Sequence, residues 1–315
     1  MFIMKKKIIS VVIPCFNEEG NVKNISDKII SLFDNELKNY LYEIIFIDND
    51  SKDNTRNIIR DICKKNKRVK AIFNAKNFGQ FNSPYYGLIQ ASGDAAVLIA
   101  ADFQEPVEMI PKFVEAYEEG YKIAIGIRKT STDNFLLRNL KKIYYDLSKK
   151  FSNVDQIKMF TGFGLYDKTF VDILKKLDDP TPFFRGIVAE LGFKRKEIYF
   201  DQGKRTAGKT SNNFYSLYDA AMLSFTSYTK IGLRLATFIG FIAMIVSFII
   251  AVIYLIMKLI WWDRFEAGVI PMLLGMLFIG AIEIFFIGVI GEYILAINQR
   301  TMKRPLVIEE ERINF

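Results

Sequence analysis

The sequence predicts an α/β domain built on a mostly parallel sheet, followed by two apolar helices that cross a membrane. In the first two hundred residues, short β-branched runs alternate with helical patterns, as in a parallel sheet covered by helices on both faces. Clusters of polar residues follow several of these runs. Toward the C-terminus, the stretch from Leu235 to Met257 carries no charge and is long enough to cross a hydrocarbon core of roughly 30 Å.

The first expected strand covers residues 8–13. It follows three lysines, but the apolar run is too short for a signal peptide and stops at Pro14, so we interpret it as a strand of a cytosolic domain. The further expected strands are 43–48, 69–74, 95–100 and 122–127, and the expected helices are 22–33, 54–65, 83–91 and 107–118. Ligands bind beyond the carboxyl ends of the strands in such sheets, and the polar clusters lie at those ends.

The chain has 315 residues, a net charge of +8 and two cysteines, Cys15 and Cys63. Two cysteines without a clear spacing pattern favour buried, reduced side chains over a disulfide framework or metal ligands. The positive residues gather next to the expected membrane surface, which accounts for them without a nucleic-acid partner.

A second apolar stretch, 267–297, is interrupted only by Glu283 and Glu292. Glu283 is costly within a membrane unless a neighbouring helix, subunit or hydrogen bond satisfies it. Positive residues lie before the first stretch and after the second, whereas the connection between them has no net charge. This distribution places both termini in the cytosol. The residues that set it are Lys230, Arg234, Arg300, Lys303 and Arg304.

Two segments near the membrane are expected to be helical. In 134–151, apolar residues recur at helical spacing beside a basic side that includes Arg138, which suits a helix on anionic lipid or an ordinary helix with a solvated face. We therefore divide the chain into an α/β domain (1–211, including the basic helix 134–151), an interfacial helix (212–230), a membrane hairpin (231–299) and a cytosolic tail (300–315).

Acidic residues end the first, second and fourth expected strands. Glu18 and Asp48 have the chemistry to accept hydrogen bonds from ribose hydroxyls and a base imide, although acidic residues also cap helices, as we expect of Asp53. Asp102 and Gln104 are two residues apart, so in an extended chain they share one side and can bind one hard cation that neutralises a diphosphate.

Seven segments resemble, in order, the inverting glycosyltransferases of the GT-A fold, and especially their polyprenyl-phosphate branch, which includes dolichol-phosphate mannose synthases and bacterial undecaprenyl-phosphate glucosyltransferases. The resemblance covers about residues 8 to 300. The segments are VVIPCFNEEGNV, FIDNDSKDNT, NFGQ, AADFQEPVEMI, GIRK, PFFRGIVAELGF and QGKRTAGKTSNNFY.

The resemblance implies a role for individual residues. Those implied to bind the nucleotide sugar are Pro14, Phe16, Glu18, Asp48, Asp102, Arg205 and Lys209. The implied ligands of a Mg²⁺ or Mn²⁺ ion are Asp102 and Gln104, and the implied contacts of the acceptor phosphate are Arg128 and Arg138. The implied catalytic group is Asp102, Arg128 and Arg205.

The sequence departs from the family at two positions. Ala100 stands where a further acidic metal ligand is usual, with Gln104 and Glu105 as the nearby substitutes, and Phe163 stands where a carboxylate often lies. An attacking sugar hydroxyl needs a general base, whereas a phosphate monoester, with a second pKa of about 6, is already largely a dianion. The missing carboxylate therefore favours a lipid-phosphate acceptor.

The resemblance thus implies a multi-pass enzyme of the inner (plasma) membrane with a cytosolic catalytic domain. It would move a sugar, most often from uridine diphosphate, to a polyprenyl (undecaprenyl) phosphate with inversion. Related bacterial enzymes suggest a homo-oligomer, with a tetramer formed through the spans as one arrangement. Two alternatives stay open: a transferase that extends a lipid-linked glycan at a hydroxyl, and a catalytically degraded membrane scaffold.

Overall fold

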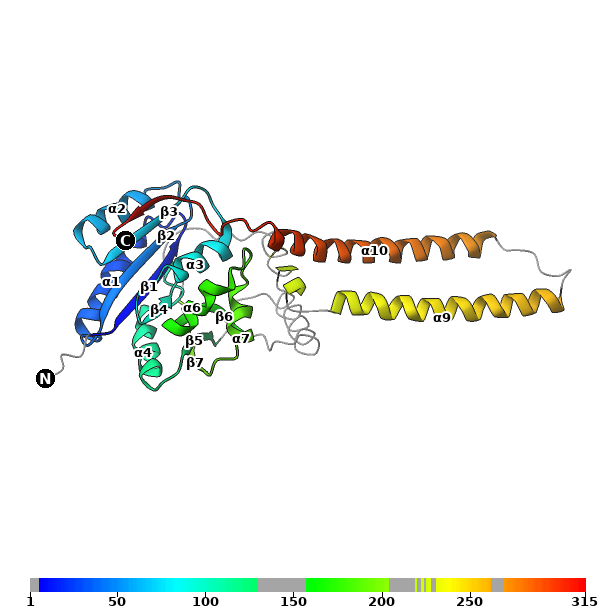
Figure 1. The fold of residues 1–315 in the computed structure, drawn as a ribbon, viewed down its shortest axis with the longest axis horizontal. Helices are drawn as coiled ribbons and strands as arrows, with labels where there is room; N and C mark the ends of the chain where they lie inside the picture. Colours follow the sequence, from blue (N-terminus) through cyan, green and yellow to red (C-terminus); the bar gives the residue numbers. More distant parts are fainter. Residues whose placement is uncertain are drawn as a thin grey trace.

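The computed structural model describes residues 6–129, 157–203, 219, 222–223, 225–227, 231–261 and 269–315. It shows a layered α/β domain from which two long helices extend side by side (Figure 1). The elements in chain order are β1 (Ile8–Cys15), α1 (Val22–Asn35), β2 (Leu41–Asp48), α2 (Thr55–Lys65), β3 (Val69–Asn74), α3 (Gly79–Ile89), β4 (Ala95–Leu98), η1 (Val107–Met109), α4 (Ile110–Glu118), β5 (Ile123–Arg128), β6 (Phe160–Asp167), α6 (Lys168–Leu177), α7 (Phe184–Glu190), β7 (Arg195–Phe200), α9 (Ile231–Ile260), α10 (Val269–Thr301) and β8 (Glu309–Ile313).

The sheet has eight strands in the order β7-β5-β6-β4-β1-β2-β3-β8. β1 runs parallel to both β2 and β4, β2 runs parallel to β3, and β5 runs parallel to β7. β6 is antiparallel to β4 and β5, and β8 is antiparallel to β3. The predicted mostly parallel α/β sheet is therefore confirmed, and the carboxyl ends of six strands share one edge with the start of β6.

Each face of the sheet packs against its own layer of helices because alternate strand residues point to opposite sides. Within β1, Ile9, Val11 and Ile13 join one core cluster with residues of α1, α2 and α4. Val12 joins the other cluster with residues of α3, α6 and α7. Both clusters are made of fully buried side chains, so the strands are held from both faces and their ends form a fixed platform.

The predicted boundaries differ from the structure in two places next to the sheet edge. β4 ends at Leu98 rather than at residue 100, because the chain turns there toward Asp102. α3 begins at Gly79 rather than at residue 83, with Pro84 inside it. The earlier end of β4 lengthens the loop that carries Asp102, and the earlier start of α3 shortens the loop after β3. The strand order is unchanged.

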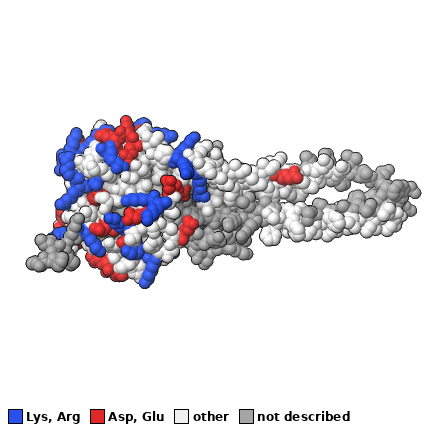
Figure 2. All heavy atoms as spheres, viewed as in Figure 1, with Lys and Arg blue, Asp and Glu red and all other residues white. Residues whose placement is uncertain are grey.

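The long helices α9 and α10 are apolar and largely exposed in the single chain. Lys, Arg, Asp and Glu gather on the α/β domain, while the described surface of the helix pair shows almost none (Figure 2). Within the part of the chain that the structure describes, one segment, Phe278–Thr301, is long and apolar enough to cross a membrane, and Thr237–Ile250 is a shorter apolar segment.

The residues after α10 return to the sheet. Arg300 lies 3.8 Å from the Asp179 carboxylate and donates to the Ser227 hydroxyl at 2.9 Å, and Asn82 donates to the Leu306 carbonyl at 3.3 Å. The chain then forms β8 along the edge of β3. Five residues of the segment expected to be a tail, 309–313, are thus a strand of the α/β domain.

Candidate active site

The ends of β2 and β4 flank the end of β1, as the sequence predicts. Cys15 pairs in register with Asp48, and the Asn49 N–H donates to the Cys15 carbonyl at 2.9 Å. On the other side, the Ile99 N–H donates to the Val12 carbonyl at 3.1 Å. Glu18, Asp48 and Asp102 therefore follow three adjacent strands at one edge of the sheet.

Side chains tie the loops after β1 and β2 to each other. Ser51 accepts from the Asn17 N–H, Thr55 accepts from the Glu18 N–H, and the Asn17 side chain accepts from the Lys52 N–H, each at 2.8 Å. Asp53 accepts from the Thr55 N–H at 3.0 Å and from the Glu19 N–H at 3.2 Å, but the N-cap position of α2 is Asn54, so Asp53 joins the two loops just before the helix rather than occupying its cap. The two loops form one rigid wall.

Each of the three strand ends contains a residue with positive φ that is not glycine. They are Asn17 (φ 56°), Asp50 (φ 69°) and Phe103 (φ 59°). This conformation is uncommon for such residues, and it concentrates at functional sites, where the surrounding structure maintains it. Its occurrence at three adjacent strand ends supports this edge as the functional one.

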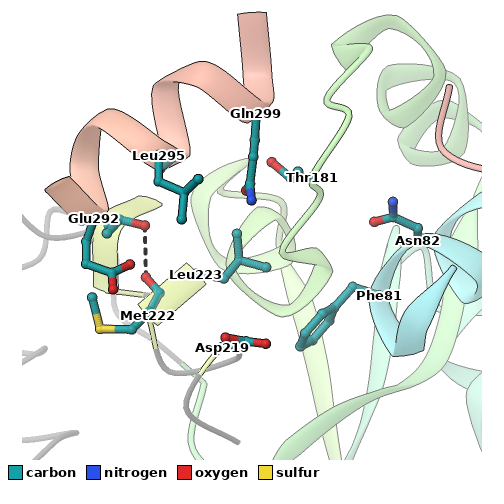
Figure 3. A pocket seen from close by; sticks show the side chains of 11 residues that line it. Phe81, Asn82, Thr181, Asp219, Met222, Leu223, Glu292, Leu295 and Gln299 are labelled. Atoms are coloured by element: carbon teal, nitrogen blue, oxygen red, sulfur yellow. Dashed lines mark hydrogen bonds between the residues drawn. The ribbon is translucent and has the colours of Figure 1, made fainter. Parts of the chain in front are cut away.

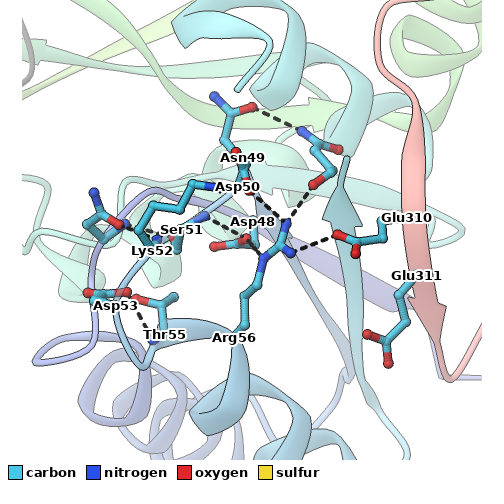
Figure 4. Close-up of polar contacts among 12 residues, drawn as sticks. Asp48, Asn49, Asp50, Ser51, Lys52, Asp53, Thr55, Arg56, Glu310 and Glu311 are labelled. Atoms are coloured by element: carbon cyan, nitrogen blue, oxygen red, sulfur yellow. Dashed lines mark hydrogen bonds and ion pairs between the residues drawn. The ribbon is translucent and has the colours of Figure 1, made fainter. Parts of the chain in front are cut away.

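Asp48 is completely buried, and only one of its two carboxylate oxygens accepts hydrogen bonds from the described residues. Its Oδ1 accepts from Arg56 Nε at 2.6 Å and from the Ser51 N–H at 3.1 Å (Figure 4). Its Oδ2 has no hydrogen-bond partner among the described residues. A buried carboxylate oxygen without a donor is costly, which makes this atom a candidate partner for a ligand's N–H group.

The end of β1 and the loop after it lie beside Asp48. Glu18 is buried and accepts from the Asn21 side chain at 2.6 Å, while Pro14 and Phe16 are half-buried. Burial raises the pKa of the Cys15 thiol well above its usual range, and the charges of Asp48 and Glu18 raise it further. Cys15 is therefore a neutral, buried thiol, as the sequence predicts, beside two carboxylates.

The Asp102 loop offers one carboxylate to a cation. Asp102 Oδ1 accepts from the Gln104 N–H at 3.1 Å. Glu105 points away, because it accepts from the Ala100 N–H at 2.8 Å and from the Thr161 hydroxyl at 2.7 Å. Burial raises the pKa of Glu105 above its ordinary value. Glu105 therefore does not replace the carboxylate that is missing at Ala100.

These donors fit an ion that is held mainly by its substrate. Among the described residues, no group of three or more His, Cys, Asp or Glu side chains is arranged to hold a metal. Mg²⁺ commonly binds proteins through one or two carboxylates and takes its remaining ligands from substrate phosphates and water. Asp102 together with a diphosphate meets that requirement, with the Gln104 side chain as a neutral oxygen donor.

Arg128 and Gly203 reach the same edge. Arg128 ends β5, its charge acts on Glu105, and its buried Nε has no hydrogen-bond partner among the described residues. The Gly203 N–H donates to the Gln104 carbonyl at 3.0 Å. Arg138, Arg205 and Lys209, and the basic helix expected at 134–151, lie outside the described residues.

Phe163 belongs to the core rather than to the site. It is buried, and its ring packs edge-on against Phe113 at 4.9 Å and Phe200 at 5.4 Å between centroids. The β6 residue that does reach the edge is Thr161, through its hydrogen bond to Glu105.

Sequence reasoning missed Arg56, which pairs with Asp48, and a network of asparagines next to it. Arg56 pairs with Asp48 from the first turn of α2. Asn74 donates to the Asn49 side chain and to the Ser83 hydroxyl at 3.1 Å each, and Asn49 donates to Asn77 at 2.8 Å. The signal was present in part, since Arg56 lies directly after the FIDNDSKDNT segment, but its direction depends on the packing of α2.

A separate cavity of about 290 Å³ lies where the end of α10 approaches the α/β domain (Figure 3). Its lining is partly apolar, and it contains the carboxylates of Asp219 and Glu292, which make it unfavourable for a phosphate. The lining residues are Phe81, Asn82, Thr181, Asp219, Met222, Leu223, Thr226, Glu292, Leu295, Ala296 and Gln299.

Known proteins resemble this chain over nearly its whole length. It is 34% identical to the prophage bactoprenol glucosyl transferase homolog of Escherichia coli (strain K12), over 95% of this chain and 97% of that protein. It is 32% identical to the bactoprenol glucosyl transferase of Shigella phage SfX, over 96% and 99%.

Among solved structures, glucosyl-3-phosphoglycerate synthase from Mycobacterium tuberculosis in complex with Mn²⁺, uridine diphosphate and phosphoglyceric acid has a TM-score of 0.45 and 19% identity, over 68% of this chain and 75% of that chain. The family profile described as glycosyl transferase family 2 matches residues 10–185. The strand ends that meet at one acidic edge lie within that match, and the chain belongs to glycosyl transferase family 2 and is a glycosyltransferase.

Proposed function

We propose that the enzyme transfers a sugar from a nucleoside diphosphate sugar to a polyprenyl phosphate, with uridine diphosphate as the first nucleotide to test. The observation that carries this proposal is the buried Asp48 Oδ2, which has no donor among the described residues at the edge where β1, β2 and β4 end. A base imide N–H is a donor of the right kind for it. Glu18 would accept from the ribose, and Pro14 and Phe16 would border the nucleoside.

The diphosphate would lie over the Asp102 loop, next to the origin of the segment with Arg205 and Lys209. Gly203 anchors that origin to the Gln104 carbonyl. A Mg²⁺ or Mn²⁺ ion held by Asp102 and Gln104 would supply charge neutralisation for the leaving diphosphate. Arg205 and Lys209 would add positive charge that offsets the charge of the diphosphate.

The acceptor proposal has two supports. Relatives that match this chain from end to end are named bactoprenol glucosyl transferases. Arg128 offers a guanidinium with a buried, unused Nε at the sheet edge, and Arg forms charge-assisted hydrogen bonds with phosphate. Arg128 and Arg138 would bind the lipid phosphate.

The chemical step we propose is a single displacement. A phosphate oxygen of the lipid attacks the anomeric carbon, the bond from that carbon to the donor diphosphate breaks, and the configuration inverts. The attacking oxygen has no proton to lose, so no general base is required. Asp102, Arg128 and Arg205 act by placing two anions in line and by offsetting their repulsion.

We further propose that α9 and α10 cross the inner (plasma) membrane as a hairpin with both chain termini and the catalytic domain in the cytosol. Support comes from the almost uncharged surface of the helix pair and from the positive residues at both cytosolic ends (Figure 2). We also propose that the protein forms a homo-oligomer, with a tetramer as the first arrangement to test. Glu283 is exposed in the single chain, and helices of neighbouring subunits would cover it.

A direct test supplies detergent-solubilised enzyme with radiolabelled UDP-glucose and either undecaprenyl phosphate or a lipid-linked oligosaccharide. We expect label in a monosaccharide phosphoryl lipid that is identified by mass. Label found only in the extended oligosaccharide would contradict the proposal that the acceptor is a polyprenyl phosphate. Nucleotide binding without product from any sugar nucleotide, together with an unchanged Asp102→Ala strain, would favour the scaffold alternative.

A further inference from the structure

The strand that follows the last membrane helix contacts the donor site. Glu310 of β8 accepts from Arg56 Nη1 at 2.8 Å, and the Nε of the same guanidinium donates to Asp48 Oδ1 at 2.6 Å (Figure 4). The Arg56 Nη2 donates to the Asn74 carbonyl at 2.5 Å. One guanidinium therefore joins β2, β3 and β8.

The backbone of β8 directs Glu310 to this position. Asn74 pairs with Glu309 and Phe73 pairs with Glu311, and the register shifts between the two pairs. Glu310 is the extra residue in this irregularity. A bulge of this kind re-aims a side chain that regular pairing would place elsewhere. The shift lies at the step of β3 nearest to the Asn74 carbonyl that Arg56 contacts.

Glu310 holds the Arg56 guanidinium, which has several other groups within reach. Arg56 also lies 3.7 Å from the Asp50 carboxylate and 5.6 Å from the Phe73 ring centroid. Its planar fork fixes the directions of its N–H groups relative to one another, so a contact at Nη1 also sets the direction of Nε. With Nη1 held by Glu310, Nε donates to Asp48 Oδ1, and Oδ2 is left without a donor among the described residues.

We propose that Glu310 is a positioning residue for donor binding: through Arg56, the strand after the membrane helix orients Asp48 toward the base. This inference rests on the proposed function, because Glu310 can affect donor binding through Asp48 only if Asp48 binds the nucleoside. It assigns to the C-terminal strand a part in recognition of the donor, whereas the acceptor contacts are left unchanged.

Glu311 provides a matched control. It is the next residue of β8, it is also exposed (38% against 58% for Glu310), and it also pairs with an arginine of α2, since Arg60 donates to it at 2.7 and 3.0 Å. Among the contacts of the described residues, Arg60 bonds to Glu311 and Asn57 and not to Asp48. Loss of strand docking or of surface charge would therefore affect Glu310→Gln and Glu311→Gln alike.

The experiment measures the dissociation constant of UDP, and of GDP in a parallel titration, for full-length wild type, Glu310→Gln and Glu311→Gln, with the KM for undecaprenyl phosphate. We expect the dissociation constant to rise about threefold to fivefold in Glu310→Gln only, a size in keeping with an exposed charge pair. The acceptor KM stays constant. Simple repulsion between a carboxylate and the anionic nucleotide predicts the opposite sign, tighter binding in both variants.

Equal behaviour of the two variants, or tighter binding in Glu310→Gln, would overturn the positioning role while the proposed function stands. If the wild-type protein binds neither UDP nor GDP, the proposed donor site itself is wrong. Thermal unfolding of all three proteins separates a folding defect from a binding defect, and Glu310→Asp, which keeps the charge on a shorter side chain, should recover part of the affinity.

Discussion

The Gly203 N–H donates to the Gln104 carbonyl, and no space is left at Gly203 for a side chain. A Cβ built there would lie 2.5 Å from the Phe103 carbonyl oxygen. Phe103 already has a positive φ, so the loop has little freedom to withdraw. The end of β7 and the Asp102 loop are thus held in backbone contact at the place where the diphosphate is proposed to lie.

Gly203→Ala is therefore expected to displace the Asp102 loop. Overpacking of this kind costs about 1–3 kcal/mol of stability, and the KM for the nucleotide sugar should rise about tenfold if about 1.4 kcal/mol of that cost falls on donor binding. Steady-state kinetics of sugar transfer measure this. Gly192→Ala is the control, because Gly192 has positive φ but free space around it, so that variant should lose some stability and keep its KM.

Asp48→Asn tests the donor contact. The amide keeps the shape of the carboxylate but weakens the pairing with Arg56, and it no longer presents two acceptor oxygens to its surroundings. A hydrogen bond to a charged group contributes about 1.5–3 kcal/mol, so the dissociation constant for the nucleotide should rise by about ten- to a hundredfold. Isothermal titration with UDP provides the value. Asp53→Asn should raise the dissociation constant less, because the Asp53 carboxylate accepts from the Thr55 and Glu19 N–H groups and asparagine keeps one acceptor oxygen.

The core strands of the sheet were predictable because they are apolar, short and followed by polar turns. β1, β2, β3 and β5 lie within about two residues of their expected bounds. β8 was not predictable, since Glu309–Ile313 contains four charged residues and has low strand propensity. It forms because it covers the edge of β3 and because arginines of α2, about 250 residues earlier, pair with its carboxylates.

The same distinction holds in the site. Local sequence indicates that Asp48 and Asp102 lie where two strands of the sheet end, but the orientation of Asp48 depends on Arg56 and Glu310, which only tertiary packing brings together. The direction of Glu105 likewise depends on Thr161 of β6, a strand that no sequence pattern had marked.

Lys70→Met tests a charge pair at the opposite end of the sheet. Glu43 is buried and contacts Lys70 Nζ at 2.6 Å, the Ser10 hydroxyl at 2.9 Å and the Ser92 N–H at 3.1 Å. Loss of Lys70 leaves a buried carboxylate without its cation, which costs about 3–5 kcal/mol. We expect a lower midpoint of thermal unfolding in detergent, with an unchanged KM for the nucleotide in the fraction that stays folded.

The pH dependence of this pair has a definite sign. Burial alone would raise the pKa of Glu43, but hydrogen bonds from Lys70 and Ser92 outweigh it, and the pKa lies below 4.5 in the folded protein. The stabilisation is present above the unfolded pKa and is lost as the pH falls through the folded pKa. Wild type should therefore lose its advantage over Lys70→Met in acid, and a difference that stays constant below pH 4 would contradict the pairing.

Glu105→Gln should have the opposite pH dependence. Burial raises the pKa of Glu105 above 4.5, against the hydrogen bonds from Thr161 and Ala100, so the folded state favours the protonated acid. Its contribution to stability is complete below the unfolded pKa and declines as the pH rises through the folded value. Glutamine keeps an acceptor for the Ala100 N–H and has no charge to bury. The midpoint of thermal unfolding of Glu105→Gln relative to wild type should therefore rise from pH 4 to pH 7. A relative midpoint that falls over this range would show that Glu105 is stabilised as a carboxylate, with Arg128 as its counter-ion, and Arg128 would then be less available to an acceptor phosphate.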